Sequence, residues 1–154
     1  MLTDRITCDI QIEAPPERVW MVMTEPRFVS RWYAFGGAEM DVCPFGTLVF
    51  RWKEHGAFNG LIATVEPPWA LTFVYACLNP GERPRFGNST LVELTLEPEG
   101  HRTRLRVAES GFAQLLAADA MKELLAASGR RAWTNGLGRL RAIAEHAVPA
   151  RREA

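Results

Sequence analysis

Apolar and polar residues alternate along most of the first two thirds of the chain, and this pattern predicts β-strands. In residues 6–13 the apolar positions are Ile6, Cys8, Ile10 and Ile12. A period of two with one apolar face is typical of a half-buried strand. The same period recurs at residues 46–52, 70–77, 92–96 and 103–109, and residues 58–66 form a further predicted strand. Turn residues separate these five segments, and over the whole region between positions 36 and 109 we expect about six consecutive antiparallel strands, and seven with the first.

The stretch APPERVW, residues 14–20, interrupts the first strand and predicts the start of a helix. Pro16 suits a first helical turn, where its missing N–H is not needed. The helix should end near Glu25, because the proline that follows disfavours helical geometry in the residue before it. We expect Trp20 to anchor this helix against the sheet, and a second short helix over residues 27–31. A proline-rich docking segment would need exposed prolines in an extended chain, whereas these prolines separate a strand from a helix.

The last third of the chain carries an apolar face at helical spacing. Its positions, at i, i+4, i+7 and i+11, are Trp133, Leu137, Leu140 and Ala144. They predict one long C-terminal helix. Gly129 and Gly136 lie on or beside this face, although glycine inside a helix costs about 1 kcal/mol relative to alanine. Two explanations stay open: the missing side chains leave space for a ligand, or they allow a close contact between helix and sheet.

Composition narrows the classes of function. At 154 residues, the chain is most simply one domain over positions 1–154. Its 18 basic and 18 acidic residues give no net charge, so we expect neither nucleic acid nor an anionic membrane as partner. No apolar run approaches the roughly 20 residues that cross a bilayer, and the N-terminus is unlike a signal peptide. Cys8, Cys43 and Cys77 share no CxxC spacing, which favours free thiols and a cytoplasmic location.

The sequence lacks motifs for metal, nucleophilic or cofactor chemistry. His55, His101 and His146 match neither HxH nor HExxH, whereas a conventional zinc site needs three or four converging ligands. The chain has no GxSxG elbow and no recognisable cysteine nucleophile. Its glycines lack the strand–loop–helix setting of a phosphate cradle. We therefore expect no metal and no cofactor, and an enzymatic role is left open without being favoured.

The order of the predicted elements, together with four sequence stretches, resembles the START-related, birch-pollen-allergen-like and polyketide cyclase-like superfamily, SRPBCC. The stretches are residues 12–33, 60–75, 89–112 and 131–146. Within it the chain is most similar to the branch of heat-shock-protein-90 ATPase activator homologues, although Ala132 stands where a glycine usually precedes the last tryptophan. The resemblance implies an α+β helix-grip fold, in which a curved antiparallel sheet of six to seven strands wraps around the long C-terminal helix. Two short helices follow the first strand, and an apolar cavity separates sheet and helix.

Glu109 is the one ionisable side chain that strand alternation places on the inner face of the sheet. Beside a cavity, desolvation would raise the pKa of this carboxyl and suit it to general acid or base catalysis. The alternative is that the end of the strand leaves Glu109 near solvent, or that it pairs with an arginine. Both interpretations stay open.

The other candidate site residues are aromatic or apolar side chains that could face the same interior. With Glu109, the predicted ligand-binding set is Trp32, Tyr33, Phe50, Trp52, Phe73, Tyr75, Glu109, Phe112, Trp133 and Leu137. Aromatic side chains often simply fill a core. As a group, however, they exceed what a small filled core needs, and tyrosine and tryptophan retain a polar group that could orient a ligand.

We expect a protein that binds a small apolar, aromatic or lipid-like molecule between the sheet and the C-terminal helix. Part of this expectation is an analogy at the level of the fold. The first alternative is an enzyme of the polyketide cyclase or aromatase type that uses Glu109 as acid or base. The second is a stress-response or chaperone-associated interaction module, which only the branch name suggests. Either a monomer or a homodimer fits the sequence.

Overall fold

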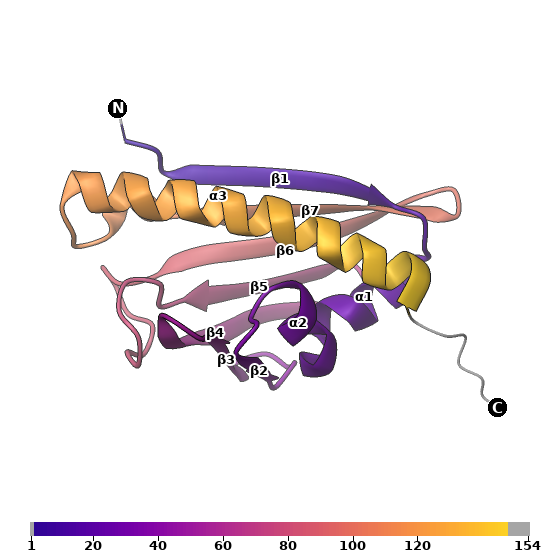
Figure 1. Cartoon of the computed structure of the whole chain (residues 1–154), viewed down its shortest axis with the longest axis horizontal. Coiled ribbons are helices and arrows are strands. Elements are labelled where there is room, and N and C mark those ends of the chain that lie inside the picture. Colours follow the sequence, from indigo (N-terminus) through magenta and orange to yellow (C-terminus); the bar gives the residue numbers. More distant parts are fainter. Residues whose placement is uncertain (1, 148–154) are drawn as a thin grey trace.

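The computed structural model describes residues 2–147, and its centre is a seven-stranded antiparallel sheet with the strand order β1-β7-β6-β5-β4-β3-β2 (Figure 1). The strands are β1 (Arg5–Ile12), β2 (Gly37–Met40), β3 (Thr47–Trp52), β4 (Gly56–Glu66), β5 (Ala70–Tyr75), β6 (Thr90–Glu99) and β7 (Arg102–Ser110). The helices are α1 (Pro16–Thr24), α2 (Pro26–Trp32) and α3 (Asp119–Ala142), with a 3-10 turn η1 (Phe112–Gln114) and a π turn η2 (Ile143–Ala147). The predicted α+β helix-grip architecture is confirmed.

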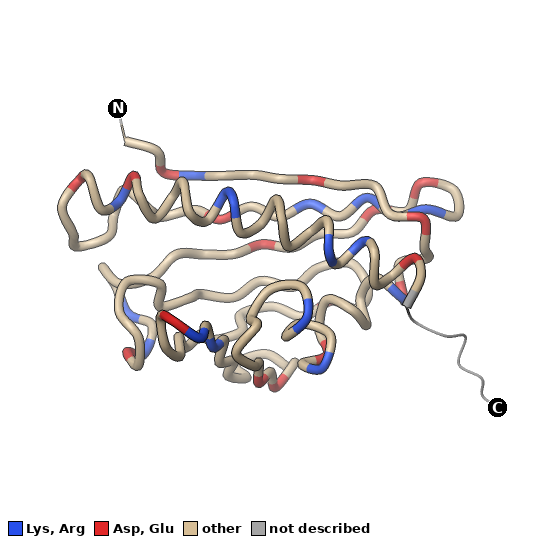
Figure 2. The backbone as a smooth tube through the Cα atoms, in the orientation of Figure 1, with Lys and Arg blue, Asp and Glu red and all other residues tan. Residues whose placement is uncertain are grey.

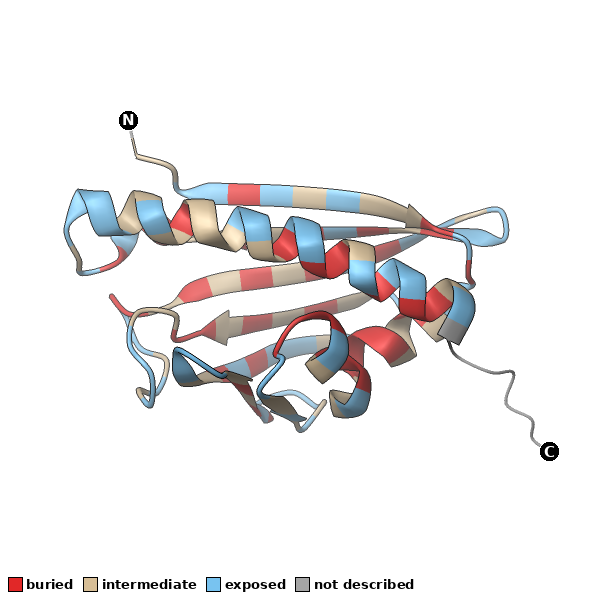
Figure 3. Cartoon of the chain, in the orientation of Figure 1, coloured by how far each residue is buried: buried red, intermediate tan, exposed pale blue. Residues whose placement is uncertain are grey.

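Strand alternation sets which side of the sheet faces the helix. On β7 the inward side chains Thr103, Leu105, Val107 and Glu109 are buried, while Arg106 on the opposite face is exposed. Strands β3, β5 and β6 show the same alternation. The helix α3 lies along this inner face and close to β1, with its buried positions turned towards the sheet (Figure 1, Figure 3). The hydrophobic core therefore lies between one helix and one face of the sheet.

Strand β4 is irregular. Its register against β5 shifts between Ile62 and Thr64, and a shift of this kind bends a strand and increases its twist. Nearby, Gly60 allows the Leu48 side chain to pass close to the backbone, because a Cβ at Gly60 would lie 2.6 Å from Leu48 Cδ1. Both features accommodate a bend in this half of the sheet.

The APPERVW stretch forms the corner between β1 and α1. Pro15 is the extended N-cap residue and Pro16 the first residue of α1, and the helix ends at Thr24 with Glu25 as its C-cap, as the sequence predicts. Trp20 packs against the hydrophobic core but is only partly buried, and Val19, Val22 and Met23 are the buried residues that anchor the helix.

Helix α2 runs from Pro26 to Trp32, slightly longer than predicted, and packs against α3 at Gly136. A Cβ at Gly136 would lie 3.0 Å from the backbone oxygen of Trp32. Gly136 therefore serves a close contact between two helices, neither the ligand space nor the helix–sheet contact that the sequence left open. At Gly129 a Cβ would meet Ile6 of β1 at 3.1 Å and Glu109 Oε1 at 3.5 Å, so this glycine serves the close contact between helix and sheet.

Basic and acidic residues are interspersed along the chain (Figure 2). Several form ion pairs on the outer face of the sheet, such as Arg104 with Glu99 at 2.9 Å. Among residues 2–147, no helix combines the length and the apolar character that crossing a bilayer requires.

Candidate functional site

A groove of about 440 Å³ lies between α3 and the inner face of the sheet, at the end where α3 begins. The strands contribute Trp52, Phe58, Tyr75 and Glu109 to its wall, and Cys77 comes from the loop that follows β5. The helix contributes Leu124, Leu125, Ser128, Gly129 and Ala132. Exposed Leu124 and exposed His55 lie where the groove meets solvent. Its size and its apolar wall with a few polar groups are typical of small-molecule sites.

Glu109 is the buried charged residue of this wall, with 5% of its surface exposed. Its position near the end of β7 turns the side chain towards α3. Thr90 donates a hydrogen bond to Oε2 at 2.6 Å, and the Trp133 indole donates one to Oε1 at 2.8 Å. Neither the solvent-exposed strand end nor the arginine pair that the sequence left open is found, because a hydroxyl and an indole are the partners within the described chain.

Burial raises the pKa of Glu109 above its usual value, and the hydrogen bonds from Thr90 and Trp133 only partly oppose this effect. Desolvation disfavours the charged carboxylate, whereas donors to its oxygens favour it. The carboxyl is thus suited to gain or lose a proton when its surroundings change.

Two phenols accompany the carboxyl. The Trp52 indole donates a hydrogen bond to the hydroxyl of Tyr75 at 3.2 Å. Tyr33 stacks on Trp133, with ring centroids 4.5 Å apart. Burial raises the pKa of both Tyr33 and Tyr75, and the nearby Glu109 raises it further. Both phenols therefore stay neutral and can donate hydrogen bonds at physiological pH.

Cys77 completes the polar part of the wall. Burial raises the pKa of its thiol to about 12, with a further contribution from the charge of Glu109. Because the thiolate is the nucleophilic form, this cysteine is unreactive at neutral pH.

The structure divides the ligand-binding residues predicted from the sequence into two groups. Those that line the groove are Tyr33, Trp52, Tyr75, Glu109 and Phe112. Those that lie in the core outside its lining are Trp32, Phe50, Phe73, Trp133 and Leu137. Residues of the second group hold those of the first in place. Trp133 stacks on Tyr33 and donates a hydrogen bond to Glu109. Phe50 packs edge-on against Tyr33, with ring centroids 5.4 Å apart.

Sequence reasoning singled out Gly129 but missed the rest of the helical wall of the groove. Leu125, Ser128, Gly129 and Ala132 follow i, i+3, i+4 and i+7, which is one face of a helix. This spacing is a signal that could have found them. It was obscured because the stripe of larger side chains beginning at Trp133 is more prominent.

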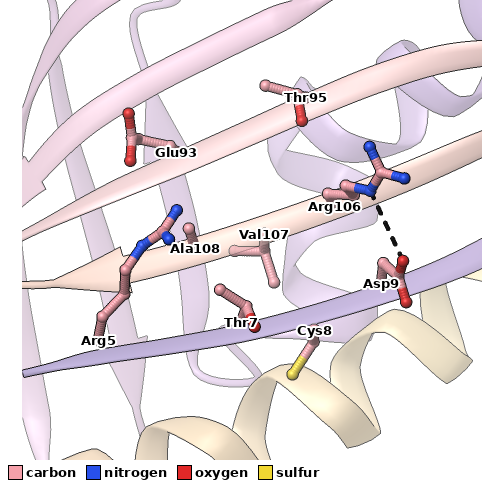
Figure 4. Close-up of a pocket in the computed structure, with 9 residues that line it drawn as sticks. All are labelled: Arg5, Thr7, Cys8, Asp9, Glu93, Thr95, Arg106, Val107 and Ala108. Carbon is pink, nitrogen blue, oxygen red and sulfur yellow. Dashed lines mark ion pairs between the residues drawn. The ribbon is translucent and has the colours of Figure 1, made fainter. Parts of the chain in front are cut away.

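A second hollow, of about 460 Å³, lies on the outer face of β1, β6 and β7 (Figure 4). Its side chains include Arg5, Asp9, Glu93 and Arg106, and Arg106 pairs with Asp9 at 3.6 Å. The view shows Cys8 turned the other way, towards the helix. Exposed ion pairs are weak and screened by salt. This hollow holds charges of both signs and no buried acid, so the groove is the better candidate site.

No three His, Cys, Asp or Glu side chains within residues 2–147 converge in a way that could hold a metal ion. The three histidines are spread over the molecule, and of these His55 alone lines the groove.

Glu109→Gln is expected to change how stability depends on pH. In the wild type, Glu109 is protonated in both states well below its usual pKa of 4.5. As pH rises, the Glu109 carboxyl ionises first in the unfolded state. The free energy of unfolding therefore falls with pH, until the pH passes the raised pKa of Glu109 in the folded state. Urea unfolding should show Glu109→Gln gaining stability relative to wild type as pH rises from 4.5, by at most about 1.4 kcal/mol per pH unit.

Glu93→Gln is the control for the loss of one carboxylate, because Glu93 lies on the outer face of β6, the strand beside β7. Parallel pH profiles for wild type and Glu109→Gln would contradict a raised pKa at Glu109.

With this geometry established, comparison with known proteins identifies the family. The family model described as "Activator of Hsp90 ATPase homolog 1-like protein" matches residues 13–145. The chain belongs to this family. The match spans α1 to η2 and includes every residue of the groove, so the resemblance seen in the sequence is confirmed. No curated protein gives a significant match.

Solved structures of this fold are similar over most of the chain. The protein MLL2253 from Mesorhizobium loti has 21% identity and a TM-score of 0.75, covering 90% of this chain and 95% of its own. The Aha1 dimer from Colwellia psychrerythraea has 19% identity and a TM-score of 0.72, covering 96% and 100%. DynU16, from the dynemicin biosynthetic locus, has 21% identity and a TM-score of 0.73, covering 97% of this chain and 50% of its own. At these identities the likeness shows the fold alone.

Proposed function

We propose that this family member binds a small apolar or amphipathic molecule in the groove between α3 and the sheet. The observation that carries the proposal is the combination, in one wall, of aromatic and aliphatic side chains with a buried carboxyl and two phenols. Apolar surface would supply most of the affinity, and a few fixed polar groups would orient the ligand. The whole chain would act as one binding domain.

Ser128→Trp is expected to weaken binding of a neutral apolar dye such as Nile red by at least about tenfold, a loss of about 1.4 kcal/mol. Ser128 is half-buried in the groove wall, so an indole at this position would occupy space that the ligand needs. The measurement is a fluorescence titration, with circular dichroism to establish that the variant is folded.

Arg130→Trp is the matched control, since Arg130 is exposed on the same helix and does not line the groove. It should bind the dye as the wild type does. Equal affinities for wild type and Ser128→Trp would place the dye elsewhere and count against the proposal.

A second candidate, an acid–base enzyme of the polyketide cyclase or aromatase type, is favoured by one observation. Glu109 combines burial with a raised pKa in the wall of a groove, and such groups cluster at catalytic sites. The pH profile of Glu109→Gln bears on this candidate too, because a carboxyl that titrates at the ordinary glutamate value has no special fitness for proton transfer.

For location and assembly we propose a cytoplasmic protein that is a monomer or a homodimer. Support for the location comes from the three cysteines, which form no disulfide with one another within the described chain. The dimer option draws on the dimeric Aha1 structure from Colwellia psychrerythraea. Sedimentation equilibrium decides between the two states.

A further inference from the structure

The charge of the groove restricts what can occupy it. Its ionisable side chains are the Glu109 carboxyl, the weak acids Tyr33, Tyr75 and Cys77, and the exposed His55 at the mouth. No lysine or arginine within the described residues lines it. A buried carboxylate without a cationic partner is unfavourable, and a second anion beside it would be more so.

The carboxyl of Glu109 is accessible from the groove. An ionised carboxylate has about four lone-pair positions on its two oxygens, and Thr90 and Trp133 each occupy one. On the helix side the neighbouring residue is Gly129, where even a Cβ would approach Oε1 to 3.5 Å. Glu109 and Gly129 both line the groove, and Gly129 adds no side chain beside the carboxyl.

Aromatic rings surround the same end of the groove. Tyr33 meets Trp52 edge-on, with centroids 4.8 Å apart and an interplanar angle of 80°. The ring centroids of Phe58 and Tyr75 lie 6.2 Å apart. The faces of such rings carry negative electrostatic potential, so they attract an ammonium group and disfavour an anion. The rings and the carboxyl therefore select for the same sign of charge.

We propose that the ligand is an amphipathic amine, whose ammonium group meets Glu109 among the aromatic rings and whose apolar body lies along Leu124 and Leu125. This inference rests on the proposed function, since it names the class of molecule that the groove takes. The ammonium supplies the counter-charge that the buried carboxylate lacks and donates to its free lone pairs. A fatty acid with the same alkyl chain as the amine would instead place its carboxylate against Glu109, and no cation would neutralise either group.

The test compares octylamine, 1-octanol and octanoate, which share one alkyl chain and differ in the charge of the head group. Displacement of Nile red from the wild type at neutral pH measures their relative affinities. We expect octylamine to bind at least about tenfold more tightly than octanoate, with 1-octanol between them. In Glu109→Gln, octylamine should lose its advantage over 1-octanol, whereas 1-octanol should still bind. Glu93→Gln, a carboxyl outside the groove, should preserve the wild-type order.

The outcomes separate this inference from the function on which it rests. If octanoate binds as tightly as octylamine to the wild type, the amine assignment is overturned and the groove remains a binding site for apolar molecules. The amine assignment is also overturned if Glu109→Gln keeps the full preference for octylamine over 1-octanol while circular dichroism shows that the variant is folded. If none of the three compounds displaces the dye and the dye itself does not bind, the proposed function fails, and the inference fails with it.

Discussion

Trp133→Ala is expected to lower the free energy of unfolding by about 4 kcal/mol, within the range for removal of a fully buried large aromatic side chain. The Trp133 side chain is 2% exposed and stacks on Tyr33. Its loss would leave a cavity at the centre of the contact between α3 and the sheet. It would also remove the indole that donates to Glu109, leaving a buried carboxyl with one donor fewer. Urea denaturation followed by circular dichroism measures the change.

Trp133→Phe helps to separate these two contributions, because it keeps a ring against Tyr33 while it removes the N–H donor and a smaller part of the buried volume than Trp133→Ala. We expect it to recover more than half of the loss. Asn135→Ala, an exposed position of the same helix, should stay within about 0.5 kcal/mol of wild type. A loss of less than 1 kcal/mol for Trp133→Ala would show that the tryptophan is not central to the packing of α3.

Gly136→Val is expected to destabilise the protein by about 2–3 kcal/mol, because it inserts a branched side chain where none fits. The first added carbon would already lie 3.0 Å from the backbone oxygen of Trp32 and 3.3 Å from its ring. To accept the larger side chain, α2 and α3 would have to separate. That movement would also displace Tyr33, which follows α2 and lines the groove.

Gly138→Val provides the matched control, since it makes the same change two residues later, where no atom lies within 4 Å of the added Cβ. Valine is a better helix former than glycine by a few tenths of a kcal/mol, so this variant should be neutral or slightly stabilised. Thermal and urea unfolding of the two variants give the comparison. Equal effects at the two glycines would mean that the contact with Trp32 does not limit the packing.

The fold was largely predictable because its strongest signals are periodic. The alternation on β7 correctly placed Thr103, Leu105 and Val107 inside, and the spacing from Trp133 to Leu140 correctly gave the buried face of α3. Strand β4 was harder to assign to a face. Leu61 and Ile62 are adjacent apolar residues on opposite faces, and the register shift after Ile62 breaks the period of two.

The site was predictable only in part, because its geometry depends on contacts between elements far apart in sequence. Alternation placed Glu109 on the inner face, but its donors Thr90 and Trp133 come from a different strand and from the helix. Aromatic residues alone could not show which rings face the groove and which fill the core. Phe50 and Tyr75, for instance, lie on the same face of neighbouring parts of the sheet, and only Tyr75 lines the groove.

Small side chains carry much of the remaining information. Ser128, Gly129 and Ala132 form part of the helical wall because they project little into the space below α3. In a sequence they stand out less than leucine or tryptophan, although their helical spacing is as regular. The groove thus arises where the large apolar residues of α3 give way to small ones.

The central claim is that the groove between α3 and the sheet binds apolar molecules, and the tryptophan indoles report on it directly. A nuclear magnetic resonance titration of the wild type with 1-octanol should shift the indole N–H signal of Trp52, which lines the groove and donates to Tyr75. The signal of Trp69, an exposed residue just before β5 and outside the groove, should stay in place. A shift of Trp69 with an unchanged Trp52 at saturating 1-octanol would contradict the account.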